Sequence, residues 1–186
     1  RGRLESEDLD AKLGGKTIPE ICMLRRKMHF GKRFRSEYFI LENAFYIMAP
    51  GLYVPVTGIE NIVKQYTAQD YLIDRRYRYF YLYFDRLESS ADFERLRDLV
   101  ENIYTNDYLN KQIVNWNQSL TAADGKSGLP QQLDFYSRFV RNNKERTVVI
   151  ISDALRYEVG RTLFEKIQAD EKCTATISAM QAVGAA

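Results

Sequence analysis

Hydrophobic residues recur at intervals of three and four along most of this chain, which is the spacing of amphipathic helices. The first predicted helix runs from about Pro19 to His29, and Thr17 and Glu20 suit its cap and first turn. We treat residues 1–17 as a loose lead-in. The same pattern predicts further helices over residues 32–48, 57–87, 92–104, 105–120 and 131–142, so that residues 18–143 form an all-helical domain.

Local polar signals divide this helical region. The run from Thr57 to Glu60 has the spacing of a capping box and is predicted to begin the longest helix. The run Thr105-Asn106-Asp107 repeats a helix-start signal, so we expect a break between two helices there. Residues 121–130 are rich in Gly, Ser, Asp and Ala, and this composition predicts an exposed loop.

The hydrophobic period changes after residue 146. The β-branched run Val148-Val149-Ile150-Ile151 is typical of a strand covered on both faces. A helix should follow, because Leu155, Val159, Leu163 and Ile167 recur every four residues. Residues 173–179 then read as a second strand, and a β-α-β crossover of this kind is almost always parallel and right-handed. The predicted fold is therefore mainly α, with a helical domain followed by the first β-α-β unit of an α/β domain over residues 146–186.

Composition limits the possible functions only weakly. The net charge is +2 and the pI is near 8.5, which is too mild to predict a nucleic-acid or membrane partner from overall charge. Cys22 and Cys173 are far apart and lack the spacing of a zinc site or a disulfide framework, so we expect a cytoplasmic setting. The sequence also lacks a long apolar stretch, a Walker A motif, a Gly-x-Ser-x-Gly motif and a His-Glu-x-x-His motif. We therefore expect no contact with a membrane.

Asp153 is the sharpest candidate for chemistry. It follows the predicted strand directly, and open α/β sheets place their ligands at the carboxyl ends of strands. A carboxylate there could bind a divalent metal, accept a phosphoryl group or act as a base. Asp is also among the best helix caps, and it could simply cap a helix beginning at Ala154. The sequence leaves both roles open.

Two further stretches are candidates for binding. The aromatic and basic run over residues 74–84 could stack on single-stranded nucleic acid, but its helical stripe of Tyr77, Phe80 and Phe84 favours packing in a core. A basic cluster around His29 could bind a partner, although such clusters are more often solvated helix faces. Its candidate partner-binding residues are Arg25, Arg26, Lys27, Lys32, Arg33 and Arg35.

The residues following position 147 carry a family resemblance. The run from Val148 to Glu158, followed by Ala175 to Met180, closely resembles the start of the PglZ domain. That family belongs to the alkaline phosphatase superfamily and to the BREX phage-resistance systems of bacteria. The stretches 71–81 and 134–136 resemble the helical region that precedes this domain in the larger PglZ proteins.

The resemblance implies a chemistry for the longer protein. Asp153 would help to hold a divalent metal (Zn, Mn or Mg), and a Ser or Thr nucleophile would follow the second strand, beyond Ala186. We therefore expect no catalytic residue, bound cofactor or hydrolase activity in this chain alone. The resemblance also implies other BREX defence proteins as partners, with DNA as a further candidate in the full complex. As an alternative function, the helical domain would be a protein interaction module that docks the protein to those components.

Overall fold

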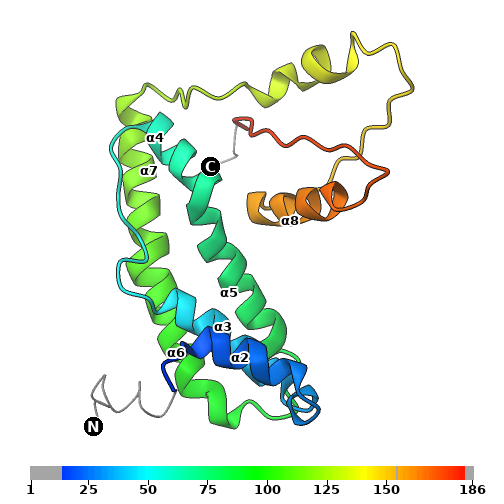
Figure 1. Cartoon of the computed structure of the whole chain (residues 1–186). Helices are drawn as coiled ribbons and strands as arrows, with labels where there is room; N and C mark the ends of the chain where they lie inside the picture. Colours follow the sequence, from blue (N-terminus) through cyan, green and yellow to red (C-terminus); the bar gives the residue numbers. More distant parts are fainter. Residues whose placement is uncertain (1–13, 154, 183–186) are drawn as a thin grey trace. The chain divides into compact units, whose positions relative to one another are not determined.

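The computed structural model describes residues 14–153 and 155–182, and it is mainly α-helical (Figure 1). The expected lead-in over residues 1–17 lies mostly outside the described residues. Short 3-10 helices lie at Phe30–Lys32, Ala91–Phe93 and Gln132–Asp134, and π-helical segments lie at Tyr66–Asp70, Ile103–Leu109 and Tyr136–Val140. The α-helices are α2 (Ile18–Lys27), α3 (Arg35–Ile47), α4 (Ile59–Gln65), α5 (Tyr71–Phe84), α6 (Glu94–Asn102), α7 (Asn110–Ala122) and α8 (Tyr157–Gln168).

The chain divides into two compact units. The described part of the first unit comprises residues 14–54 and 72–112, and it contains α2, α3, α6 and most of α5. The second unit comprises residues 55–71 and the described residues from 113 onward, and it contains α4, most of α7, and α8. Each unit is therefore built from stretches that are far apart in sequence.

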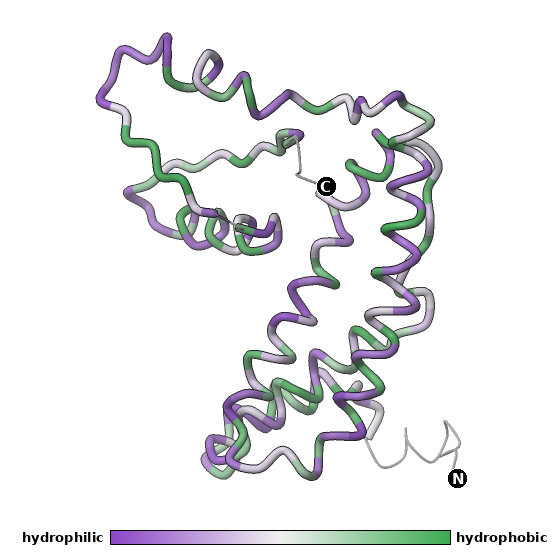
Figure 2. Tube along the Cα trace, turned by 180° about the vertical axis from the view of Figure 1, so that it is seen from behind, coloured by the Kyte–Doolittle hydropathy of each residue, from purple (hydrophilic) through white to green (hydrophobic). Residues whose placement is uncertain are grey.

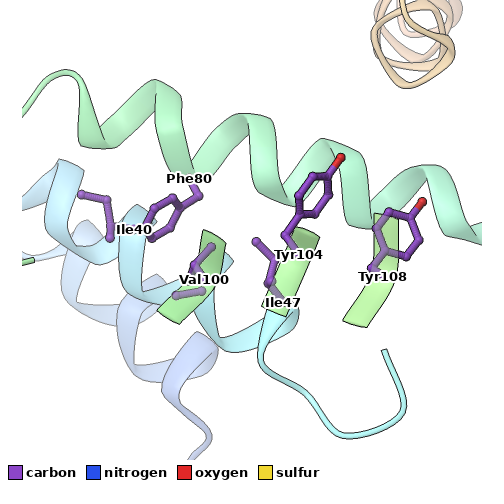
Figure 3. Packing of buried hydrophobic residues seen from close by; sticks show 7 residues of the cluster. Ile40, Ile47, Phe80, Val100, Tyr104 and Tyr108 are labelled. Atoms are coloured by element: carbon purple, nitrogen blue, oxygen red, sulfur yellow. The ribbon is translucent and has the colours of Figure 1, made fainter. Parts of the chain in front are cut away.

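The core of the first unit is assembled from α3, α5, α6 and the π-helical segment that follows α6. Figure 3 shows Ile40 and Phe80 close to Val100, with Ile47 beside Tyr104. Phe80, Val100 and Ile40 are fully buried, and such apolar burial is the main favourable contribution to folding. The aromatic stripe of α5 therefore faces this core, as the sequence predicted.

A capping box at the start of α2 and a tight turn at its end define the α2–α3 hairpin. Thr17 and Glu20 form a complete capping box at the start of α2, which confirms their predicted role. The turn after α2 packs tightly, because a Cβ placed on Gly31 would lie 1.7 Å from the carbonyl oxygen of Arg25. Only a residue without a side chain fits there.

The helix break predicted at Thr105 is wrong. Residues 94–122 form one uninterrupted helical stretch, in which α6 passes through the π-helical segment Ile103–Leu109 into α7. That segment buries Tyr104 and Tyr108, which are at most 6% exposed. Tertiary burial outweighs the local preference of Asn and Asp for helix starts. The predicted cap at Thr57 is also absent, because α4 begins after Gly58 (φ 89°) without a side-chain cap.

The structure also differs from the sequence prediction at the β-α-β unit. In the described part of the chain, residues 148–151 and 173–179 are extended but belong to no β-ladder, and the isolated parallel bridge there joins Gln131 to Gln181. Figure 2 shows the apolar run before α8 as a hydrophobic stretch of extended chain. Ile150 and Ile151 are 86% and 90% exposed. A strand needs a neighbouring strand to satisfy its backbone groups, and within these residues none pairs with it.

Candidate functional site

Asp153 lies in a turn on the exposed surface, just before α8. The helix begins at Tyr157 with Arg156 in the extended conformation at its N-cap (φ −65°, ψ 148°). Asp153 is therefore not the cap of α8, and that interpretation of the sequence was wrong. The helix start predicted at Ala154 lies outside the described residues, but Leu155 after it is not helical.

Within the second unit, Tyr157 attaches the start of α8 to the π-helical segment Tyr66–Asp70. Its hydroxyl donates a hydrogen bond to the carbonyl oxygen of Thr67 at 3.3 Å, and its ring contacts Tyr66 and Tyr71 with centroid separations of 5.8 and 5.7 Å. Burial raises the pKa of Tyr157 above its ordinary value. Thr67 and Tyr66 belong to a π-helical segment, a geometry that occurs often at functional sites.

Charged side chains lie on α8 and in the π-helical segment Tyr66–Asp70. The guanidinium of Arg161 lies over the Tyr71 ring at 5.3 Å, and a hydrogen bond with Tyr71 raises the pKa of Arg161. Glu158 is fully buried on this helix, and Asp70 is 6% exposed and accepts a hydrogen bond from the Gln65 amide at 2.9 Å. Burial of a carboxylate costs free energy unless it is hydrogen-bonded, so the bond from the Gln65 amide helps to stabilise Asp70 in its buried position.

An open cavity of about 330 Å³ runs beside α8. Its walls are mostly apolar, and they come from α8 and from the extended residues 175–178. The residues that line it include Leu163, Phe164, Ile167, Ala175, Ile177 and Ser178. Leu155 and Arg156 reach its edge, so Asp153 lies two residues along the chain from this cavity.

Gln181 holds the loop that precedes the π-helical segment Tyr136–Val140. Its side-chain oxygen accepts hydrogen bonds from the backbone N–H and the hydroxyl of Ser127, at 3.1 and 2.6 Å, and its amide donates to the Gly125 carbonyl at 2.9 Å. The backbone N–H of Gln181 donates to the Pro130 carbonyl at 2.8 Å. Ser127 is only 2% exposed, so the prediction of an exposed loop over residues 121–130 was wrong at this residue.

The contact between Gln181 and Ser127 could not be found from the sequence. The residues are 54 positions apart, and neither belongs to a periodic pattern or a motif. Only the structure brings them together.

The basic cluster lies on the α2–α3 hairpin, and its members differ in exposure. The guanidinium of Arg26 lies 3.9 Å above the Phe39 ring and pairs with Glu42, so Arg26 is part of the packing between α2 and α3. His29 is exposed. The other predicted members are also exposed: Arg25, Lys27, Lys32, Arg33 and Arg35.

The tyrosines of α5 are engaged in packing and hydrogen bonding. The Tyr77 ring stacks on Tyr104 with a centroid separation of 3.7 Å, and the hydroxyls of Tyr77 and Tyr81 donate to Glu101 at 2.6 and 2.5 Å. Tyr104 in turn donates to Asp74 at 3.0 Å. This packing confirms the preferred core interpretation of the run. The face of Tyr77 that stacks on Tyr104 is therefore closed to a base.

The residues that the structure describes do not gather into a metal centre. No group of three or more His, Cys, Asp or Glu side chains within them could hold a metal ion. Asp153 supplies one carboxylate, which suits a hard or borderline divalent cation but is far from a complete set of ligands. No helix in the described ranges is both long and apolar enough to cross a membrane.

Known proteins resemble both the helical region and the residues around Asp153. Residues 135–185 match the family model described as the BREX system PglZ alkaline phosphatase-like domain. The chain is 38% identical over 175 residues to the alkaline phosphatase-like protein PglZ of Bacillus cereus strain H3081.97, an alignment that covers 88% of the chain. The resemblance to the PglZ family is confirmed.

A second relative of the PglZ type belongs to another bacterium. The chain is 32% identical over 126 residues to the alkaline phosphatase-like protein BrxZ of Escherichia coli O9:H4 strain HS, with 61% of the chain covered. The chain spans 20% of the PglZ relative and 15% of BrxZ, so it corresponds to a limited part of each. No solved structure matches the chain significantly.

Proposed function

We propose that this chain is the helical region and the first part of the phosphatase-like domain of a PglZ-type BREX phage-defence protein. The observation that carries the proposal is the match of residues 135–185, which includes Asp153, to the PglZ domain. In the structure Asp153 is exposed in the turn before α8. Other BREX components would be its partners, with DNA as a further partner in the full complex.

The chemistry proposed for the longer protein is metal-dependent hydrolysis of a phosphate ester. A bound divalent metal would supply stabilisation of the negative charge that develops on the phosphoryl group and its attacking oxygen. The role of Asp153 is to hold that cation, while Tyr157 fixes the start of α8 and thereby the turn that carries Asp153. The longer protein would supply the nucleophile and the further ligands that select the metal (Zn, Mn or Mg). The chain alone is expected to be inactive.

The test compares the full-length protein with an Asp153→Asn variant. We expect the variant to lose most of its metal-dependent hydrolysis of a nitrophenyl phosphate ester and to bind the metal more weakly. Asp92→Asn, which alters an exposed carboxylate in the first unit, is the matched control and should retain activity. Unchanged metal affinity and rate in Asp153→Asn, or robust metal-dependent hydrolysis by residues 1–186 alone, would contradict the proposal.

A second function is favoured by the exposed basic side chains of the α2–α3 hairpin: docking to another defence component. A pull-down with the whole chain tests it, using charge reversal of Arg25 and Lys27. Arg26 should be left intact, because its pairing with Glu42 is part of the fold. Loss of a captured BREX protein on charge reversal supports docking, and unchanged capture argues against it.

A further inference from the structure

The α2–α3 hairpin exposes an unusual number of apolar side chains. Met23, Leu24 and Met28 on α2 and its C-cap, and Phe30 and Phe34 in the turn that follows, have exposed fractions between 39% and 55%. Single exposed apolar residues are ordinary, but five of them within residues 23–34 are typical of a contact surface. We call these residues the hairpin surface.

Basic residues outnumber acidic residues on the α2–α3 hairpin, with six Lys and Arg residues against Glu20, Glu37 and Glu42. Among the ion pairs of the described residues, Glu42 is engaged by Arg26 and by Arg76. The carboxylate of Glu20 accepts hydrogen bonds from the backbone N–H and the hydroxyl of Thr17, at 2.7 and 2.9 Å. The exposed basic residues named above therefore give this surface a positive field, and it fits a negatively charged partner.

The hairpin surface is also pre-organised. The capping box fixes the start of α2, and the contact of Gly31 with the Arg25 carbonyl fixes the turn. Cys22 is 2% exposed and anchors the opposite face of α2. A rigid surface loses little conformational entropy when a partner binds, which favours affinity.

We propose that the hairpin surface docks an acidic amphipathic helix of a protein partner. This proposal rests on the docking function above and specifies the chemistry of its partner. Acidic side chains on such a helix would complement Lys27, Lys32 and Arg33, while its apolar residues at spacings of three and four would contact the Met and Phe side chains. Methionines and phenylalanines adapt to the side chains of a docked helix.

Two other kinds of partner fit the hairpin surface less well. A helix that lies on a membrane keeps its apolar and basic residues on separate faces, whereas Arg26 and Lys27 follow Met23 by three and four residues and so lie beside it on the surface of α2. Single-stranded nucleic acid stacks on aromatic faces, and only Phe30 and Phe34 of the hairpin surface offer a ring, whereas Met23, Leu24 and Met28 do not.

The probe for this test is a fluorescently labelled helical peptide with Leu at positions i, i+3, i+4 and i+7 and Glu at most other positions. Its control has the same composition in a scrambled order. Anisotropy titrations with residues 1–186 should give at least about tenfold tighter binding of the amphipathic peptide. A single-stranded oligonucleotide and phosphatidylserine vesicles are the competing probes.

Two double variants test which residues make the contact. Lys27→Glu with Lys32→Glu should weaken peptide binding about tenfold and reduce its salt dependence, and Met28→Ala with Phe30→Ala should weaken it by a similar factor. Lys166→Glu, an exposed charge reversal on α8, is the matched control and should leave binding unchanged. Melting curves confirm that each variant folds.

Either of two results would overturn the proposal. One is equal binding of the ordered and scrambled peptides, or binding that neither double variant weakens. The other is tighter binding of the oligonucleotide or the vesicles, which would assign the hairpin surface to nucleic acid or lipid. If the pull-down loses its BREX partner on charge reversal while the peptide does not bind, docking stands and only the inferred partner chemistry fails.

Discussion

Tyr77 donates its hydroxyl proton to the carboxylate of Glu101 at 2.6 Å, and this bond joins α5 to α6 in the first unit. Tyr81 donates to the same carboxylate. These hydrogen bonds, that of Tyr77 above all, lower the pKa of Glu101 below its ordinary value. Burial, followed by the bond to Glu101, raises the pKa of Tyr77 and raises that of Tyr81 to about 12.

The first prediction concerns the pH dependence of stability. A carboxylate with a lowered pKa stabilises the fold above its unfolded pKa, so this contribution should be lost as the pH falls below about 4.5. A tyrosine with a raised pKa stabilises the fold below its unfolded pKa, so that contribution should be lost as the pH rises from 10 through about 12. Urea unfolding across this range measures both limits.

Glu101→Gln should flatten the acid limb of that profile. Near neutral pH the variant should lose about 1 kcal/mol of unfolding free energy. This value is at the low end for a hydrogen bond to a charged group, because Glu101 is exposed to solvent. Glu94→Gln, on the same helix, is the control and should leave the acid limb unchanged. Identical profiles for Glu101→Gln and the parent chain would contradict the assignment.

The second prediction concerns two glycines, one in a crowded turn and one in an open part of a helix. Gly31→Ala should destabilise the chain by roughly 1–3 kcal/mol, because the new methyl group would overlap the Arg25 carbonyl. Gly160→Ala should instead stabilise α8 by about 0.5–1 kcal/mol, since a Cβ there meets nothing within 4 Å and alanine favours the helix. The changes in unfolding free energy of the two variants, each relative to the parent chain, should differ in sign. Equal changes would contradict the close approach at Gly31.

The third prediction concerns the loop held by Gln181. Gln181→Ala removes the acceptor of the Ser127 N–H and hydroxyl, so the amide of Ser127 should exchange its hydrogen faster, by about tenfold or more. Gln118→Ala, an exposed residue of α7, should leave that rate unchanged. Hydrogen exchange followed by mass spectrometry measures both, and an unchanged rate in Gln181→Ala would show that the loop is held by other contacts.

The fourth prediction concerns the two cysteines. Cys173 is exposed, whereas Cys22 is buried and its burial raises the pKa of its thiol. A maleimide reagent at neutral pH should therefore label Cys173 quickly and Cys22 only after unfolding, because the thiolate is the reactive species. Peptide mapping of the labelled chain distinguishes the sites. Equal labelling rates in the folded chain would contradict the burial of Cys22.

Local patterns predicted much of the helical region correctly. The capping box at Thr17 and the aromatic stripe of α5 are determined by short-range spacing, which the sequence displays directly. The break predicted at Thr105 failed because burial of Tyr104 and Tyr108 supports a continuous helix through a π-helical turn. Polar helix-start residues report a local preference, and that preference is weaker than tertiary packing.

The candidate site was predictable only in part. Asp153 was named as a candidate because it follows an apolar run. That it does not cap α8 could be seen only from the structure, in which the N-cap is Arg156. The contacts of Tyr157 with Thr67 and of Gln181 with Ser127 join residues 90 and 54 positions apart. No periodicity encodes such pairs.

The exposed run Val148–Ile151 has a practical consequence for handling the protein in solution. Its β-branched side chains combine high strand propensity with no charge, which is the composition of segments that start aggregation. Charged residues stand on both sides of it, with Lys144, Glu145 and Arg146 before the run and Asp153 after it. These neighbours act as gatekeepers against edge-to-edge association between molecules. Asp153 is therefore expected to limit aggregation, whatever its other roles.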